Sequence, residues 1–177
     1  TRRGQADFVI ERLSELVAGD REGGDRIDYR SGGDLPVEQV LKLYRANRWS
    51  SAEKPEQLRA SLAGSHAVVT AWHGDRLVGL GNTLSDGHLV VYYSHLLVHP
   101  DYQGRGVGRR IAEELKAGYE GFHQHVLLAD GRAVDFYRKL GFERAGGTMP
   151  MWIYAGTDHG VGTGTRFVLF DWGNTLM

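Results

Sequence analysis

The sequence predicts a mixed α/β (α+β) domain with helices on both faces of a central sheet. The order of the patterns is the first reason: helical segments, then three strand-like runs joined by short turns, then a strand–helix–strand–helix unit. That order is typical of a partly parallel sheet between two helical layers. The size is the second reason, because 177 residues, 41% of them hydrophobic, suit one domain with a buried core.

The first third of the chain is expected to be helical. Residues 6–18 carry apolar side chains at helical spacing, and glycines and charges follow, so we treat residues 1–25 as a helical appendage and linker. A helix is expected near Pro36, with Asp34 as its cap. A second short helix should follow Pro55.

The run 66–98 predicts three strands in an antiparallel meander. Gly74-Asp75 and Asp86-Gly87 are the turn signals between them. Four further elements are predicted downstream: a helix after Gly106, a strand at 125–129, a helix at 132–140 and a last apolar strand near 149–154.

Composition argues against several classes of protein. With 21 basic and 22 acidic residues the net charge is −1, so no general nucleic-acid binding is expected. The absence of cysteine removes disulfides, thiolate nucleophiles and cysteine zinc sites, and it fits a cytoplasmic protein. No apolar run reaches 18 residues, so no membrane span is expected. His123 and His125 lack a third ligand, and no metal is predicted.

The most informative segment follows the apolar strand that ends at Leu96-Leu97-Val98. Three glycines alternate immediately before an amphipathic helix: Gly104, Gly106 and Gly108. Backbone N–H groups without a neighbouring Cβ, together with the positive end of a helix, make an anion site suited to a pyrophosphate. Arg105, Arg109 and Arg110 add positive charge. An ordinary glycine-rich turn is the alternative. The spacing matches neither a nucleotide P-loop nor the dinucleotide-binding G-x-G-x-x-G pattern.

Two sequence blocks resemble one family. Gln103-Gly104-Arg105-Gly106-Val107-Gly108 is similar to the Gln/Arg-x-x-Gly-x-Gly/Ala signature of the GNAT (GCN5-related N-acetyltransferase) superfamily. Ala133-Val134-Asp135-Phe136-Tyr137-Arg138-Lys139-Leu140-Gly141-Phe142 resembles its A-x-x-x-Y-x-x-x-G-F segment. The resemblance covers about residues 26–155. It implies a GNAT acyltransferase domain there, with about six to seven strands and a splayed fourth and fifth strand.

The resemblance implies an N-acetyltransferase that moves an acetyl group from acetyl-CoA, its co-substrate, to a primary amine by direct attack in a ternary complex, without a metal. The pantetheine arm would lie between the splayed strands and the pyrophosphate on the glycine loop. The implied cofactor-binding residues are Leu96, Leu97, Val98, Gln103, Gly104, Arg105, Gly106, Val107, Gly108, Arg109, Asp130, Ala133 and Phe136. Asp130 stands where the family often has Asn, and it can instead cap the helix that starts at Gly131.

Tyr137 is implied as the acid that protonates the departing CoA thiolate, although it also lies on an apolar helix stripe. The family's usual base positions hold Tyr92 and Ser94. His95 is the nearest titratable side chain, and an imidazole suits a general base, but a hydrogen-bonded structural histidine is the alternative. Weaker candidates are Asp86, His88, His125 and a water relay.

The acceptor is expected to be a small-molecule or peptide amine, and residues 128–137 are similar to enzymes that act on lysine side chains or arylalkylamines. Helices within 36–62, the neighbouring strands and the last strand should form its surface, with six aromatic residues: Tyr44, Trp49, Trp72, Tyr92, Tyr93 and Trp152. A homodimer is left open. Because Tyr92 and Ser94 replace a base, a non-catalytic acyl-CoA-binding regulatory module is an alternative.

The C-terminal residues 156–177 are predicted as a linker and a strand outside the acyltransferase domain. Residues 167–176 resemble the first strand of haloacid-dehalogenase-type phosphatases, with Asp171 at the nucleophile position. The other phosphatase motifs are absent, so no phosphatase activity is expected. One interpretation is a truncated second domain, which would make the chain the acyltransferase part of a bifunctional acyltransferase-phosphatase protein.

Overall fold

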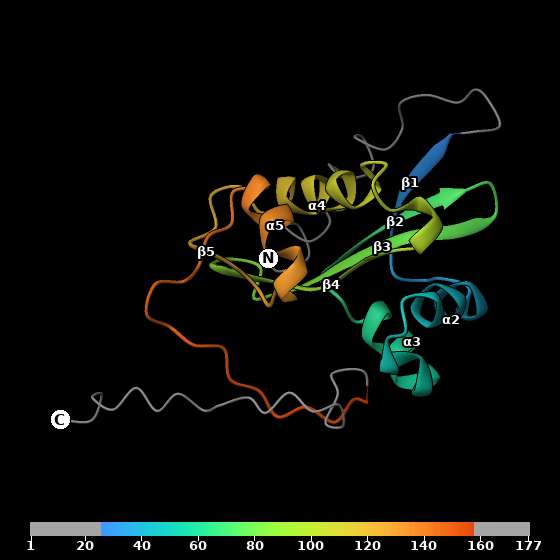
Figure 1. Cartoon of the computed structure of the whole chain (residues 1–177), viewed down its shortest axis with the longest axis horizontal. Helices are drawn as coiled ribbons and strands as arrows, with labels where there is room; N and C mark the ends of the chain where they lie inside the picture. Colours follow the sequence, from blue (N-terminus) through green and yellow to red (C-terminus); the bar gives the residue numbers. More distant parts are fainter. Residues whose placement is uncertain (1–25, 158–177) are drawn as a thin grey trace.

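The computed structural model describes residues 26–157, which form a five-stranded mixed sheet between two helical layers (Figure 1). The strand order is β1-β2-β3-β4-β5. The helices and strands are β1 (Ile27–Ser31), α2 (Val37–Ala46), η1 (Ser50–Glu53), α3 (Pro55–Ala63), β2 (Ala67–His73), β3 (Arg76–Ser85), β4 (Val90–Val98), η2 (Pro100–Tyr102), α4 (Val107–Ala117), β5 (Gln124–Leu127), η3 (Gly131–Ala133) and α5 (Val134–Lys139). The predicted helix at 6–18 and strand at 167–176 lie outside the described residues.

The predicted meander is confirmed, with both turns where the Gly-Asp and Asp-Gly pairs indicated them. β2, β3 and β4 pair antiparallel, and β5 pairs parallel to β4. The sequence interpretation missed β1, which pairs antiparallel with β2. Its five residues are too short for a distinct alternating pattern, and pairing with β2 stabilises a segment that its own sequence leaves ambiguous.

Two apolar cores lie on the two faces of the sheet. On one face α4 packs through Val107, Ile111 and Leu115, all buried against β2, β3 and β4. On the other face α2 and α3 pack through Tyr44, Leu58 and other buried side chains. The layers are visible in Figure 1, with α4 and α5 above the sheet and α2 and α3 below it.

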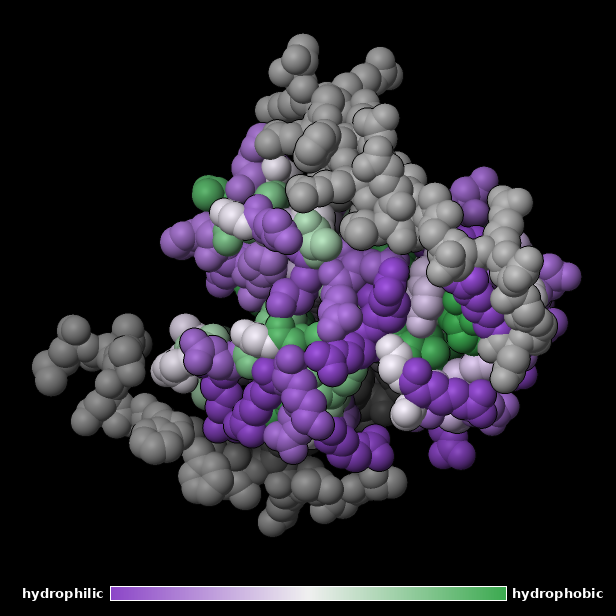
Figure 2. Space-filling view, turned by 90° about the horizontal axis from the view of Figure 1, so that it is seen from above, coloured by the Kyte–Doolittle hydropathy of each residue, from purple (hydrophilic) through white to green (hydrophobic). Residues whose placement is uncertain are grey.

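Two glycines allow α4 to lie close to the middle strand. A Cβ added at Gly79 would lie 2.8 Å from Ile111 Cδ1, and one at Gly81 would lie 2.7 Å from Ile111 Cγ2. Real Cβ atoms do not approach so closely, so a larger residue at either position would displace the helix or the strand. The outer side of α4 is polar, and the visible part of this face is mainly hydrophilic (Figure 2).

Two predicted details of the fold are wrong, and two predicted elements are present with different bounds. Asp34 does not cap α2, because Pro36 is the capping residue and no side-chain hydrogen bond caps this end. The helix predicted at 132–140 is a short η3 followed by α5, and β5 ends at Leu127.

The second error concerns the strand predicted near 149–154, where the structure has no strand. Met151 and Ile153 are fully or almost fully exposed there, at 93% and 104%. Pro150 lacks a backbone donor and disfavours sheet pairing at this point. The segment instead runs toward η1, where the Tyr154 and Ser50 hydroxyl oxygens are 3.4 Å apart. The described sheet therefore has five strands and not six or seven.

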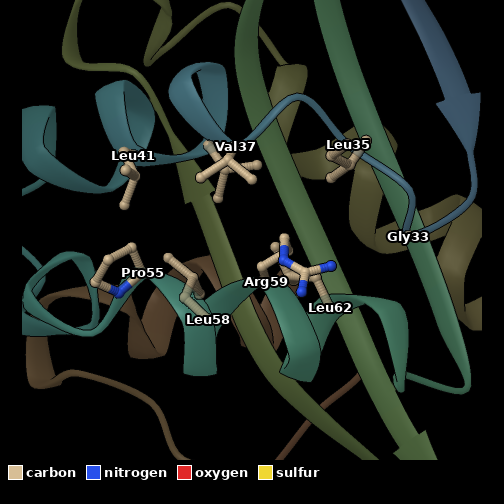
Figure 3. Close-up of a pocket in the computed structure, with 9 residues that line it drawn as sticks. Gly33, Leu35, Val37, Leu41, Pro55, Leu58, Arg59 and Leu62 are labelled. Atoms are coloured by element: carbon tan, nitrogen blue, oxygen red, sulfur yellow. The ribbon is translucent and has the colours of Figure 1, made fainter.

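A small apolar gap lies between α2 and α3 (Figure 3). Val37 and Leu41 point from α2 toward Pro55 and Leu58 of α3. Its volume is about 10 Å³, which is room for roughly one water molecule. We therefore regard it as a packing gap and look elsewhere for a substrate site.

Candidate active site

The candidate active site begins where β4 and β5 separate. β5 pairs with β4 only from Val90 to Tyr93, and β4 continues to Val98. The register of β3 against β4 shifts at Asn82/Thr83, so Ser94 is an extra residue in β4 at this point. Beyond the shift, 94–98 has no neighbouring strand on the β5 side among the described residues.

The pairing pattern shows which backbone groups face this gap. The His99 N–H donates to the Val78 carbonyl over 2.8 Å. In an antiparallel ladder the hydrogen-bonded pairs alternate, so Leu97 bonds to β3 while the N–H and C=O groups of Leu96 and Val98 point toward the gap. The prediction is corrected for Leu97, whose backbone faces β3 and whose side chain is buried in the α2 and α3 core.

The glycine loop has the geometry of an anion cradle at the open end of the gap. Gly104 and Gly106 have φ of +75° and +82°, and nothing lies within 4 Å of a Cβ placed on either. No side chain caps α4, so the first-turn N–H groups at 107–109 need acceptors from outside the helix. The Gln103 side chain donates to the Val98 carbonyl over 3.0 Å, which ties the loop to the end of β4.

Three elements meet beside this loop. A Cβ on Gly108 would lie 3.3 Å from Val98 Cγ2 and 3.8 Å from Phe136 Cζ. The end of β4, the start of α4 and the face of α5 therefore converge on one place. The sequence blocks 103–108 and 133–142, which are distant in the chain, are brought together as the resemblance implied.

The arginines near the loop differ in their partners. Arg109 and Arg110 each bond to a glutamate one turn along α4. Arg105 makes no ion pair with any described residue, and its guanidinium lies 5.3 Å from the centre of the Tyr102 ring. The Tyr102 hydroxyl is 2.6 Å from His73 Nδ1, which fixes that ring. Among the three arginines of the loop region, Arg105 is thus the one whose guanidinium packs on a fixed aromatic ring and forms no ion pair with a described carboxylate.

Asp130 and Ala133 lie in the turn before α5. The Asp130 carboxylate accepts a hydrogen bond from the Arg132 N–H over 2.9 Å and caps η3, as one of the two predicted interpretations required. Ala133 ends η3 and is half-buried. A contact of Asp130 with a cofactor stays a prediction.

Tyr137 lies on α5 in an aromatic cluster. Its ring packs edge-on against Phe136 and Phe142, with centroids 5.0 Å and 6.0 Å away. Burial raises the pKa of Tyr137, and the nearby Tyr92 raises it further. The Tyr137 hydroxyl has no hydrogen-bond partner among residues 26–157, unlike the core tyrosines Tyr93 and Tyr119.

His95 lies on the opposite side of β4 from the α4 core and is held by three contacts. The Tyr44 hydroxyl is 2.7 Å from His95 Nδ1, and the Trp49 ring packs edge-on at 5.2 Å. The backbone N–H of His95 donates to Asn82 Oδ1 over 3.0 Å. Burial raises the pKa of Tyr44, so Tyr44 keeps its proton near neutral pH and fixes the ring of His95.

Two of the weaker candidates for the base, Asp86 and His125, are engaged in structural hydrogen bonds. Asp86 accepts hydrogen bonds from the N–H groups of His88, Leu89 and Val90 in the β3–β4 turn. These bonds, that of His88 first, lower the pKa of Asp86 to about 2, which makes it a poor base. His125 stacks on Tyr93 and bonds to its hydroxyl at 2.8 Å, and burial above all lowers its pKa.

His95 also borders a polar cleft of about 290 Å³ that the sequence did not single out. Its lining consists of Ser50, Ser51, Glu53, Lys54, Gln57, Leu58, Ser61, His95, Tyr154, Ala155 and Gly156. The predicted helical region contributes one wall, but none of the six predicted aromatic residues lines the cleft. The short η1 gave no periodic signal, and its approach to residues 154–156 spans about a hundred positions of sequence.

No three histidine, aspartate or glutamate side chains gather in a way that would hold a metal ion within residues 26–157. No helix in the same range has the length and apolar character needed to cross a membrane.

Comparisons with known proteins agree with this geometry. The sequence model of the acetyltransferase (GNAT) domain matches residues 34–150. A GNAT-family acetyltransferase structure from Streptococcus pneumoniae is 30% identical, with a TM-score of 0.65 over 73% of this chain and 98% of that one. A structure of glucosamine-6-phosphate N-acetyltransferase from Arabidopsis thaliana, 13% identical, shares the fold with a TM-score of 0.56 over 73% and 99% of the two chains.

Two plant proteins are similar in sequence. One is named a histone acetyltransferase from Glycine max, 32% identical over 133 residues, covering 67% of this chain. The other is named a chloroplastic GCN5-related N-acetyltransferase from Arabidopsis thaliana, 29% identical over 153 residues, covering 72% of this chain. The chain spans 57% and 58% of their lengths. With the family model matching most of the chain and the fold and the two sequence blocks in agreement, this protein belongs to the GNAT acetyltransferase family.

Proposed function

We propose that this protein transfers the acetyl group of acetyl-CoA to a primary amine by direct attack in a ternary complex. The observation that carries the proposal is the gap between β4 and β5, with the uncapped start of α4 at its open end. An extended chain that ends in a pyrophosphate fits this combination, because backbone groups line the gap and N–H donors lie beyond it.

The residues fit acetyl-CoA as follows. Leu96 and Val98 would bond to the amide groups of the pantetheine arm, and the N–H groups at 107–109 with Arg105 would hold the pyrophosphate. Phe136 would border the arm from α5. The thioester of the co-substrate supplies an activated acetyl group, and the protein has to orient it toward the amine.

Tyr137 and His95 would handle the protons. The amine nitrogen forms a bond to the acetyl carbon, the C–S bond breaks, and the sulfur leaves as a thiolate that takes up a proton. A free tyrosine titrates near 10 and a thiol near 8.5, and burial raises the pKa of Tyr137, so complete transfer from Tyr137 is uphill by at least about 2 kcal/mol. Tyr137 would therefore act mainly by hydrogen bonding to the developing charge on sulfur.

A base is needed because an alkylammonium near pKa 10.4 costs about 4–5 kcal/mol to deprotonate at pH 7. His95 would accept this proton at Nε2, directly or through water, as the tautomer whose Nδ1–H donates to the Tyr44 hydroxyl oxygen. It borders the cleft, and its ring is held by Tyr44 and Trp49.

The experiment is a thiol-release assay with acetyl-CoA and a panel of primary amines. The chain has no cysteine, so a thiol reagent detects CoA without background from the protein. We expect His95→Gln to lower kcat about 10²-fold, the lower part of the range for a positioned base. His88→Gln, at an exposed histidine in the β3–β4 turn, is the matched control. Tight CoA binding without release from any amine would favour a regulatory module instead.

A further inference from the structure

The cleft beside His95 carries charges of both signs that have no ionic partner in the described part of the chain. Glu53 ends η1 and Lys54 follows it, and both line the cleft. Neither forms an ion pair with another residue of 26–157. By contrast, Glu56 pairs with Arg59 at 3.5 Å and does not line the cleft.

The Glu53 carboxylate is positioned and not merely exposed. The Thr157 hydroxyl donates to Glu53 Oε1 over 3.0 Å. This bond joins η1 to the C-terminal segment, and the Tyr154 and Ser50 hydroxyls make a second link between the same two segments. The carboxylate is thereby held at the rim where both walls of the cleft meet.

The rest of the lining combines apolar surface with hydroxyl and amide groups. Four side chains supply these groups: Ser50, Ser51, Gln57 and Ser61. Besides the imidazole of His95, the only aromatic ring in the described lining is that of Tyr154. A flat hydrophobic amine would bring no hydrogen-bonding groups to the polar part of this lining, whereas a polar amine can bond to it. The volume of about 290 Å³ lies at the lower end of small-molecule sites, which run from roughly 300 to 1,000 Å³.

From these observations we propose that the acceptor is a free diamino carboxylic acid whose distal amine is acetylated. Glu53 binds the α-ammonium group, Lys54 binds the α-carboxylate, and the distal amine reaches the acetyl carbon beside His95. This inference rests on the acetyl-transfer function proposed above and narrows its acceptor. A lysine inside a peptide has neither α-charge, so both charged side chains would discriminate against it.

The test uses the whole chain, acetyl-CoA and four amines that carry both, one or neither of the two α-charges. L-Lysine has both α-groups, cadaverine lacks the carboxylate, ε-aminocaproate lacks the α-amine, and Nα-acetyl-lysine methylamide lacks both charges. We expect L-lysine to have a kcat/KM at least tenfold above that of the doubly blocked lysine, a difference of about 1.4 kcal/mol. The product should be Nε-acetyl-lysine by mass spectrometry.

Single-charge variants assign the two contacts. Glu53→Gln should raise KM about tenfold for L-lysine and cadaverine but leave ε-aminocaproate unchanged. Lys54→Met should raise KM about tenfold for L-lysine and ε-aminocaproate but leave the KM for cadaverine unchanged. Glu56→Gln is the control that removes a nearby carboxylate outside the cleft, and all acceptor constants should stay within twofold. The KM for acetyl-CoA should not change in any variant.

The outcomes separate the two proposals. Equal kcat/KM for free and doubly blocked lysine would overturn the diamino acid assignment while confirming acetyl transfer. Acetylation of the α-amine would also overturn it, because the charged end would then face His95. Thiol release from another amine of the panel but from none of these four would overturn the diamino acid assignment alone. No release from any amine of the panel would contradict the acetyl-transfer function itself.

Discussion

Replacing Tyr137 with Phe tests the proposed acid most directly, because the structure predicts a large effect on rate and little effect on stability. Phe retains the ring that packs against Phe136 and Phe142. The hydroxyl lost has no hydrogen-bond partner among the described residues, so its removal breaks no bond there. The Tyr137 hydroxyl is not among the fully buried atoms that lack a partner, so its loss should leave the stability close to that of the parent.

The expected effect on rate is large. A positioned acid contributes roughly 10²–10⁴ in rate, so Tyr137→Phe should raise the barrier by about 2.7–5.4 kcal/mol with unchanged CoA affinity. The assay is kcat for thiol release between about pH 6 and 9.5, together with the melting temperature and calorimetric CoA binding. Tyr29→Phe is the matched control, since burial raises the pKa of Tyr29 as well, its hydroxyl also has no hydrogen-bond partner within 26–157, and β1 lies at the opposite edge of the sheet from β5.

The pH range adds a second criterion. Burial raises the pKa of Tyr137, so its proton should remain throughout the assayed range and kcat should not fall there through loss of that proton. A kcat within a factor of two of the parent at every pH would show that Tyr137 is structural. A falling limb below pH 9.5 that disappears in Tyr137→Phe would contradict the predicted direction of the shift.

Two further predictions concern the loop and a turn. Gly106→Val should weaken CoA binding at least tenfold, about 1.4 kcal/mol, because a β-branched residue at φ +82° is strained and its side chain would cover the N–H groups. Unchanged CoA affinity by calorimetry, with an intact circular dichroism spectrum, would reject this site. Asp86→Ala should lower the melting temperature at pH 7. Since the folded pKa of Asp86 is depressed to about 2, its contribution to stability is present above the unfolded pKa of about 3.9 and is lost as the pH falls through about 2. The difference between parent and variant should therefore narrow from pH 4 to pH 2, and a constant difference would contradict the ionic origin of the effect.

Local signals in the sequence predicted the parts of the fold that short segments determine. The Gly74-Asp75 turn and the glycines before α4 need special backbone conformations, and their residue types reveal them. The pairing of Tyr44 with His95 was not predictable, because the two residues are 51 positions apart and meet only when α2 packs on the sheet. The extra residue at Ser94 likewise depends on the register with β3 and leaves no local mark.

The candidate site likewise has one part that the sequence predicted and one part that it did not. The cofactor loop could be predicted because its chemistry lies in consecutive residues, whereas the acceptor cleft could not. Glu53 and Thr157 join walls that are 104 positions apart, and the apolar pattern at 149–154 predicted a strand where the chain crosses to η1 instead.

The close contact between α4 and β3 has a consequence for ligand binding. The first turn of α4 holds the proposed anion donors, and the height of that turn above the sheet depends on the absence of side chains at Gly79 and Gly81. Affinity for the proposed acetyl-CoA would therefore depend partly on residue size at two buried positions of β3 that lie beneath α4. A larger residue at Gly79 or Gly81 would lower this affinity while every residue proposed to bind the co-substrate stayed the same.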